Sequence, residues 1–250
     1  MNLALQTRHL QKQFGGFMAA HDVSLEVQDG ARHALIGPNG AGKTTLINLL
    51  TGFLEPTAGA VILRGEDVTH LPQHRRVARG LARTFQINRL FADLTVLETV
   101  TMAVCERLGL NARFWRPVGA HARAVDEAAA LLTQLRLAEV AHQRTRDLAY
   151  GKQRLIEIAL ALAARPTVLL LDEPAAGVPT GESRELFETI AALPRSVTIV
   201  LIEHDMDLVF RFADRITVLV SGAILTEGDP RAIAADPRVK AVYLGEASHG

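Results

Sequence analysis

A nine-residue segment of this chain, GPNGAGKTT at residues 37–45, fits the pattern GxxxxGK[ST] at every fixed position. It follows an apolar stretch at residues 34–36 and precedes a segment of helical character at residues 46–50, so the expected order is strand, loop and helix. In that order the loop glycines let backbone N–H groups turn inward around a β-phosphate, Lys43 reaches the β- and γ-phosphate oxygens, and the Thr44 hydroxyl is placed to bind Mg²⁺. A glycine-rich turn that matches by chance would lack this setting. The segment therefore predicts a site for a nucleoside triphosphate, formed by Asn39, Gly40, Gly42, Lys43, Thr44 and Thr45.

An apolar run further along the chain ends in two carboxylates, TVLLLDEP at residues 167–174. A continuous apolar run is typical of a parallel strand that is buried on both faces, and the carboxyl end of such a strand opens on a ligand site. We expect Asp172 to hold the Mg²⁺ shell, directly or through water, and Glu173 to act as the general base on the attacking water. Two adjacent acids also occur in solvated turns, but the buried strand before them favours the pair of metal ligand and base.

The next apolar run, VTIVLI at residues 197–202, ends in Glu203, His204 and Asp205. Parallel strands end at the same edge of a sheet, so His204 is expected near the acidic pair. There it can contact a γ-phosphate or the attacking water. The alternative for a single histidine at a strand end is an ordinary surface residue.

The segment LAYGKQR at residues 148–154 opens a predicted helix from Lys152 to about Ala164. Gly151 lies at the start of this helix, where free N–H groups and the helix dipole favour an anion. Taken alone, this could be an ordinary glycine turn before a core helix. Gly151 precedes Asp172 by 21 residues, however, so the helix leads directly back to the acidic strand.

These motifs, in this order, resemble the nucleotide-binding subunits of ATP-binding cassette (ABC) transporters. The resemblance includes a glutamine, Gln86, in the segment TFQ between the phosphate loop and the helix. It implies that the nucleotide is ATP and that the chain is an ATPase. It also implies that Gln86 senses Mg²⁺ and the γ-phosphate and links the core to a helical subdomain, and that Phe14 stacks on adenine, with Phe17 as the alternative.

A closer resemblance is to the ATPase subunits of branched-chain amino acid importers. The phrases FGGFMAAHDVSLEV, LTGFLEPTAG, ARTFQINRLFADLTVLE, LLLDEPAAG and the tail DPRVKAVYLGE are similar to that group, and ATPase chemistry does not require the tail. The implied function is import of branched-chain or related amino acids. Lipopolysaccharide export and urea or amide uptake are alternatives within the family. A cassette protein without a permease, in DNA repair or translation, is the alternative from another class, but such proteins usually carry coiled-coil insertions or two cassettes, and this chain has neither.

The resemblance also implies partners. Two ATPase subunits, identical or paralogous, would face each other head to tail, with ATP held between the phosphate loop of one and the Gly151 helix of the other. Transmembrane permease subunits would bind this pair, and a solute-binding protein would act through them. Two departures from the family pattern bear on this: the common signature LSGGQ is replaced by LAYGK at residues 148–152, which loses the serine hydroxyl, and residues 175–179 lack an aspartate that many relatives have. The branched-chain group carries a similar AYG form.

Composition agrees with this interpretation. The net charge is zero, without the basic excess that nucleic-acid binding normally leaves. The single Cys105 excludes an internal disulfide and fits a reducing cytosol. No apolar run approaches the roughly 20 residues needed to span a bilayer, and there is no signal-peptide pattern. We therefore expect a peripheral protein at the cytoplasmic face of the membrane, held there by its partners.

Alternating strands and helices predict an α/β fold with a mostly parallel sheet, as in phosphate-loop NTPases. We expect an N-terminal antiparallel β subdomain before the phosphate loop and a single nucleotide-binding domain over residues 1–250. The expected core is about residues 1–86 and 148–250, and the helical subdomain about 87–147. An apolar stripe at helical spacing supports the latter: Val125, Ala128, Leu132 and Leu135. Within it, residues 107–117 combine basic and aromatic side chains and are either a surface loop with a packed tryptophan or a contact to the permease or lipid headgroups.

Overall fold

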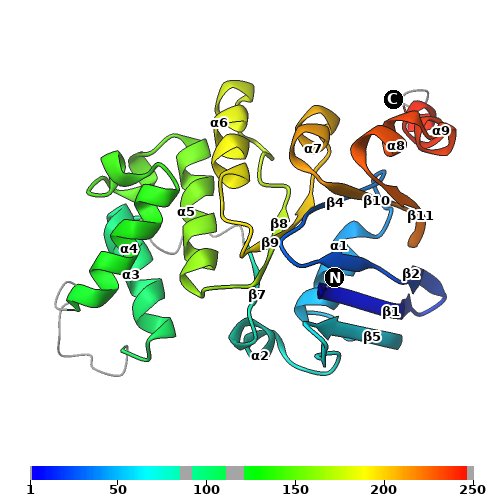
Figure 1. The fold of residues 1–250 in the computed structure, drawn as a ribbon, viewed down its shortest axis with the longest axis horizontal. Coiled ribbons are helices and arrows are strands. Elements are labelled where there is room, and N and C mark those ends of the chain that lie inside the picture. Colours follow the sequence, from blue (N-terminus) through cyan, green and yellow to red (C-terminus); the bar gives the residue numbers. More distant parts are fainter. Residues whose placement is uncertain (1, 85–91, 111–120, 247–250) are drawn as a thin grey trace. The chain divides into compact units, whose positions relative to one another are not determined.

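The computed structural model describes residues 2–84, 92–110 and 121–246, and the chain divides into two compact units. The first unit contains residues 1–81, 167–173 and 195–250, and the second contains residues 82–166 and 174–194. Figure 1 gives the elements of both, and each unit is described by itself below.

A six-stranded sheet has the order β11-β10-β4-β9-β8-β7, and its strands other than β7 belong to the first unit. Strands β10, β4, β9 and β8 run parallel to one another, and β11 returns antiparallel beside β10. This confirms the predicted mostly parallel sheet, with strands at the two apolar runs after residues 167 and 197. The bounds are β4 (Arg32–Ile36), β7 (Leu81–Arg83), β8 (Val168–Asp172), β9 (Thr198–Ile202), β10 (Arg215–Val220) and β11 (Ala223–Gly228).

Alternate residues of the central strands enter two different hydrophobic clusters. Leu35 of β4 belongs to one cluster, with Leu46 and Leu50 of helix α1 (Lys43–Thr51), whereas its neighbours Ala34 and Ile36 belong to the other, with residues of the C-terminal helices. Successive side chains of a strand point to opposite faces, so both faces of this sheet are covered. The remaining helices of this unit are α2 (Gln73–Ala78), α7 (Met206–Phe212), α8 (Pro230–Ala235) and α9 (Pro237–Glu246).

A second sheet is formed by three strands that precede the phosphate loop in sequence and two that follow helix α1. It is antiparallel, in the order β2-β1-β5-β6 with β3 beside β1, which confirms the predicted N-terminal β subdomain. The strands are β1 (Leu3–Phe14), β2 (Phe17–Val23), β3 (Glu26–Gln28), β5 (Ala58–Leu63) and β6 (Glu66–Asp67).

The buried guanidinium of Arg76, in α2, fixes the carboxyl end of helix α1. It donates to the backbone oxygens of Leu49 (2.7 Å) and Leu50 (2.6 Å), and also to those of Thr69 (2.7 Å) and Leu71 (2.9 Å). The last carbonyls of a helix have no partner within the helix, so this side chain supplies one. Burial lowers the pKa of Arg76 to about 10, so the guanidinium stays charged near neutral pH.

The second unit is helical. A capping box at Thr95 and Glu98 begins its first helix. Glu127 then joins three helices: it accepts from Arg107 (2.6 Å) and Arg165 (2.9 Å), and Arg107 also donates to the carbonyl of Ala163 (2.7 Å). The elements are α3 (Val96–Arg107), α4 (Ala122–Gln134), η2 (Ala138–Val140), η3 (Thr145–Asp147), α5 (Tyr150–Ala163) and α6 (Thr180–Ala191).

The predicted stripe is buried at Ala128, Leu132 and Leu135 and half-buried at Val125. Contacts group residues 148–166 and 174–194 with this unit, whereas the sequence-based division assigns them to the core; the division into core and helical subdomain stays a prediction. Residues 111–117 of the predicted basic and aromatic loop lie outside the described residues. Over the part of the chain that the structure describes, no helix is both long and apolar enough to cross a membrane.

A buried histidine lies in β4, directly before the phosphate loop. The hydroxyl of Thr217 donates to Glu227 (2.9 Å), so it accepts from His33 Nε2 (2.8 Å), which must carry a proton. The second ring nitrogen, Nδ1, is buried and has no hydrogen-bond partner among the described residues. Burial therefore lowers the pKa of His33 to about 4.

This depressed pKa predicts a loss of stability in mild acid. The unfolded chain takes up the proton below its ordinary pKa of 6.5, while folded His33 stays neutral until about 4, so stability falls as the pH drops through this window. From pH 7.5 to 5.0 the parent should lose about 2 kcal/mol more than His33→Gln, which removes the titration. Urea unfolding at both pH values measures the free energy of unfolding of each chain. An equal loss of stability in the two chains would contradict the prediction.

Candidate functional site

The predicted phosphate loop joins β4 to α1 and approaches its neighbours too closely for most side chains. A Cβ on Gly37 would lie 2.1 Å from the carbonyl oxygen of Leu219, and one on Gly42 would lie 2.7 Å from that of Ala19. Gly42 also has a φ of 99°, in the left-handed region, where it forms the N-cap of α1. Both positions therefore require glycine. Gly40 differs, since its φ is 77° but a Cβ there would meet nothing within 4 Å.

Backbone hydrogen bonds hold the loop against the turn between β10 and β11. Gly222 donates its N–H to the carbonyl of Ala41 (2.9 Å), and the carbonyl of Gly222 accepts from His21 of β2 (2.7 Å). The loop thus has two neighbours that are distant in sequence. The shape of the loop therefore depends on the turn between β10 and β11 and on β2 as well as on the loop's own residues.

The first residue of α1 is Lys43, and its side chain is buried within the loop. Its Nζ donates to the carbonyl oxygens of Gly37 (2.6 Å) and Pro38 (2.9 Å). The next residue, Thr44, is exposed and Thr45 is half-buried, while Asn39 is exposed on the loop. The structure thus places the Lys43 ammonium against the backbone at the start of the predicted loop.

The acidic strand and the histidine reach the same edge of the sheet as this loop. Ile202, the last residue of β9, is opposite both Leu35 of β4 and Asp172 of β8 in the parallel register. Three strands therefore end side by side: Asp172 is the last residue of β8, and the loop, Glu173 and His204 come within two residues after the strand ends. This is the edge at which parallel sheets bind ligands.

Glu173 and His204 are in direct contact. His204 Nε2 lies 2.5 Å from Glu173 Oε1, and the N–H of Glu173 donates to the carbonyl of Ile202 (2.9 Å). Glu173 has a φ of 48°, an unfavourable backbone conformation for a glutamate. The backbone N–H of His204 donates to the buried carboxylate of Glu203 (2.9 Å). The sequence placed His204 at this edge but did not predict its contact with Glu173.

Two aromatic residues face each other across the hairpin of β1 and β2. Phe14 pairs with Phe17 in the strand register, and their exposed fractions are 45% and 65%. The Lys12 ammonium lies 5.1 Å from the centre of the Phe14 ring. Neither ring is buried in the core, so a planar ligand can reach both, although Lys12 lies over the Phe14 ring.

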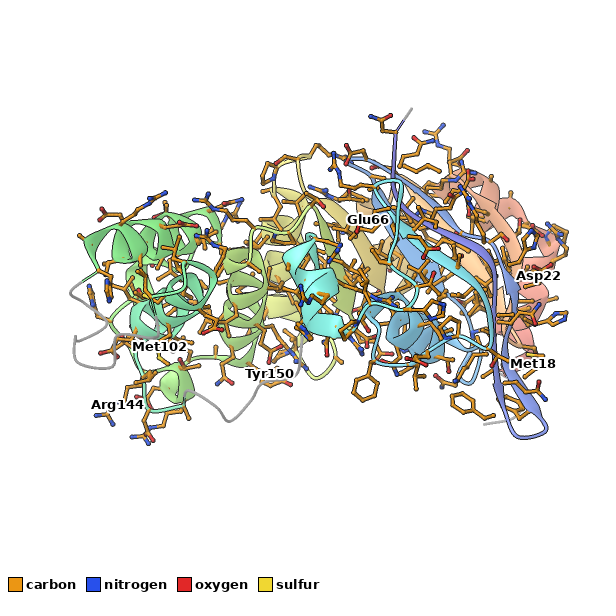
Figure 2. The ribbon with its side chains drawn as sticks, turned by 90° about the horizontal axis from the view of Figure 1, so that it is seen from below. Met18, Asp22, Glu66, Met102, Arg144 and Tyr150 are labelled. Carbon is orange, nitrogen blue, oxygen red and sulfur yellow. The ribbon has the colours of Figure 1, made fainter. Side chains whose placement is uncertain are left out.

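The residues that replace the usual signature join the start of α5 to the loop after the acidic strand. Tyr150, labelled in Figure 2, is the first residue of α5, and its ring lies so close to Gly177 that a Cβ there would be 3.3 Å from Tyr150 Cε1. The guanidinium of Arg154 lies 4.9 Å from the centre of the Tyr150 ring and donates to the carbonyl of Ala176 (3.2 Å). The sequence analysis did not predict these contacts. It noted only that residues 148–152 depart from the common signature.

Gly151 is buried in the first turn of α5, and its N–H donates to Glu182 Oε2 of α6 (2.8 Å). Sequence reasoning also missed Glu182, because nothing in its local sequence indicates a contact with a helix 31 residues away. Gln86 lies outside the described residues.

The residues at the sheet edge fit a magnesium nucleotide. Thr44 is exposed and Asp172 is half-buried, and their hydroxyl and carboxylate oxygens are hard donors of the kind that suits Mg²⁺. No group of three or more His, Cys, Asp or Glu residues that could hold a metal occurs within the described ranges. Nucleotide sites commonly hold Mg²⁺ by one or two protein oxygens together with the phosphates, which is the donor set available at this edge.

Comparisons with known proteins agree with this geometry. Residues 20–176 match the family model described as ABC transporter, and residues 223–249 match the model described as branched-chain amino acid ATP-binding cassette transporter. The chain is 42% identical to the transport ATP-binding protein BraF of Pseudomonas aeruginosa and 43% identical to LivG of Escherichia coli, each over 97% of this chain and 98% of the relative. A solved ATP-binding cassette in its ADP conformation has a TM-score of 0.87 at 32% identity, covering 98% of this chain and 99% of that one, and a nucleotide-free cassette has 0.85 at 32% identity, covering 97% and 99%.

The chain therefore belongs to the ATP-binding proteins of ABC transporters, in the group that includes LivG and BraF. As a member of this family it binds ATP and couples ATP hydrolysis to transport.

The loop geometry predicts different costs for two glycine substitutions. Gly40→Ala and Gly42→Ala both place alanine in the left-handed region, but only the second overlaps a backbone oxygen, that of Ala19 at 2.7 Å. We expect a loss of about 1 kcal/mol for Gly40→Ala and about 3 kcal/mol for Gly42→Ala. Urea unfolding without nucleotide measures both, and equal losses would contradict the close approach of β2 to the loop.

Proposed function

We propose that this chain is the ATP-hydrolysing subunit of an importer for branched-chain or related amino acids. The observation that supports hydrolysis is the meeting of the phosphate loop, Asp172 and the Glu173–His204 pair at one sheet edge. Importer function is supported by the names of the BraF and LivG relatives and by the match of residues 223–249, a region that ATPase chemistry does not require. That match favours this solute class over lipopolysaccharide export or urea uptake.

Binding of the triphosphate depends on the loop and Lys43. Loop N–H groups and the Lys43 ammonium donate to phosphate oxygens, and the lysine leaves the carbonyls of Gly37 and Pro38 to do so. Thr44 and Asp172 would hold Mg²⁺, which supplies charge neutralisation at the phosphates when it is bound. Phe14, or Phe17 in its place, stacks on adenine, and Gln86 is assigned to Mg²⁺ and the γ-phosphate from the sequence alone.

Hydrolysis depends on the pair at the strand ends. Glu173 is the general base: one oxygen accepts from His204 Nε2, which holds the carboxylate in place, and the second oxygen takes the proton of the attacking water. Glu173 directly follows the last residue of β8 and has a left-handed backbone, a strained conformation of the kind found at functional sites. His204 thereby orients the base and remains close to the γ-phosphate position.

The remaining parts of the proposal concern partners. Two ATPase subunits, identical or paralogous, bind ATP between the phosphate loop of one and Gly151 of the other. They dock on transmembrane permease subunits at the cytoplasmic face of the membrane, and an external solute-binding protein delivers the amino acid. The helix dipole of α5 favours the negative charge of the phosphate at Gly151.

Glu173→Gln tests the proposed chemistry. The amide fills the same space but cannot accept the proton of the water, so turnover should fall by about 10² or more while ATP binding is kept. The variant should also accumulate as a nucleotide-bound dimer. Steady-state phosphate release and equilibrium ATP binding measure the two properties, with Glu185→Ala as an exposed carboxylate control. Turnover within about threefold of the parent, against this general-base effect, would remove Glu173 from the role.

The same variant tests the transport proposal in cells. Uptake of labelled leucine, isoleucine and valine should fall to the level of a strain without the protein when Glu173→Gln replaces the parent. Unchanged uptake of all three, with hydrolysis abolished in vitro, would contradict the proposed solutes and leave the ATPase assignment intact.

A further inference from the structure

The amino end of α5 is capped by a residue from another helix. Its N-cap residue, Ala149, makes no side-chain capping hydrogen bond, and its first turn contains no acidic residue. The carboxylate of Glu182, in the first turn of α6, instead accepts the N–H of Gly151 at 2.8 Å. Both residues belong to the second unit. An anion at this end of a helix is stabilised by the free N–H groups and by the dipole.

Glu182 fills the space beside Gly151 as well as bonding to it. A Cβ on Gly151 would lie 2.8 Å from Glu182 Oε2 and 3.1 Å from Glu182 Cβ, with Val178 Cγ1 next at 3.5 Å. A second oxyanion therefore cannot reach this N–H while Glu182 stays in place. Like charges at hydrogen-bond distance from the same donor also repel each other.

The carboxylate has an alternative position nearby. A cavity of about 160 Å³ is lined by Glu182 and Gly151, by a second acid, Glu185, and by two cationic residues, Arg136 and Lys152. Its apolar lining comes from Ala149, Leu155 and Leu186. Rotation of the Glu182 side chain toward the cations would uncover the N–H of Gly151 without moving either helix.

From these contacts we propose that Glu182 occupies the amino end of α5, by accepting the N–H of Gly151, until the nucleotide bound to a partner subunit displaces its carboxylate. This rests on the proposed function, in which Gly151 binds the γ-phosphate held by the opposite subunit. Glu182 is then an internal competitor: it stabilises the separate subunit and raises the ATP concentration needed for two subunits to close. In the closed pair its carboxylate is bound by Arg136 and Lys152.

The test uses chains that also carry Glu173→Gln, so that hydrolysis does not limit the lifetime of the dimer. Sedimentation velocity over a series of ATP concentrations gives the dimerisation constant of this parent and of chains with Glu182→Ala, Glu182→Gln or Asp126→Ala added. Glu182→Ala removes the competing oxyanion, so dimerisation should strengthen about tenfold or more, the value of one charge-assisted hydrogen bond. Glu182→Gln keeps an acceptor but loses the charge, so its effect should be intermediate. Asp126 of α4 is an exposed acid that does not line this cavity, so Asp126→Ala should match the parent.

Stability separates this role from a purely structural one. Loss of the cap should lower the urea midpoint of Glu182→Ala while dimerisation becomes stronger, whereas a structural cap would weaken both. Equal or weaker dimerisation of Glu182→Ala than of the parent would overturn the proposal, and Glu182→Gln decides in the same way if the alanine variant does not fold. Absence of ATP-dependent dimerisation in the parent itself would instead contradict the proposed function.

Discussion

The close approach of the phosphate loop to its neighbours is the constraint on which the nucleotide site depends. Gly37 and Gly42 lie against the backbone oxygens of Leu219 and Ala19, so the loop follows a path that only glycine allows at these two points. The same contacts link it to β10 and β2, while Arg76 fixes the far end of α1. Lys43 and the strand-end carboxylates lie at one edge of the sheet because β4, β8 and β9 end side by side.

Three groups assigned to the nucleotide or the attacking water have partners within the chain. Lys43 donates to the carbonyls of its own loop, Gly151 donates to Glu182, and Glu173 pairs with His204. Each of these contacts lies within one compact unit. Buried donors are costly to leave without partners, so the separate subunit supplies its own. Under the proposed function, ATP binding exchanges the internal contacts of Lys43 and Gly151 for contacts with phosphate.

Features determined by local sequence could be predicted, and features determined by distant contacts could not. The phosphate loop, the buried strands that end at Asp172 and Ile202, and the α/β class follow from short patterns with a clear period, and the structure has them. The contact of Gly151 with Glu182 and that of Tyr150 with Gly177 join segments that are far apart in sequence and depend on how two helices and a loop pack. Gln86 lies outside the described residues, so its predicted role stays a prediction.

The central claim is that the loop around Lys43 binds the triphosphate, and calorimetric titration of Mg²⁺-ATP into the parent and into Lys43→Ala tests it most directly. Loss of the charge that donates to the phosphate oxygens should weaken binding by about 10² or more. The exposed Lys240, changed to alanine, is the control for loss of one positive charge, and it should leave the affinity unchanged. Equal affinities of the parent and a folded Lys43→Ala chain would contradict the account.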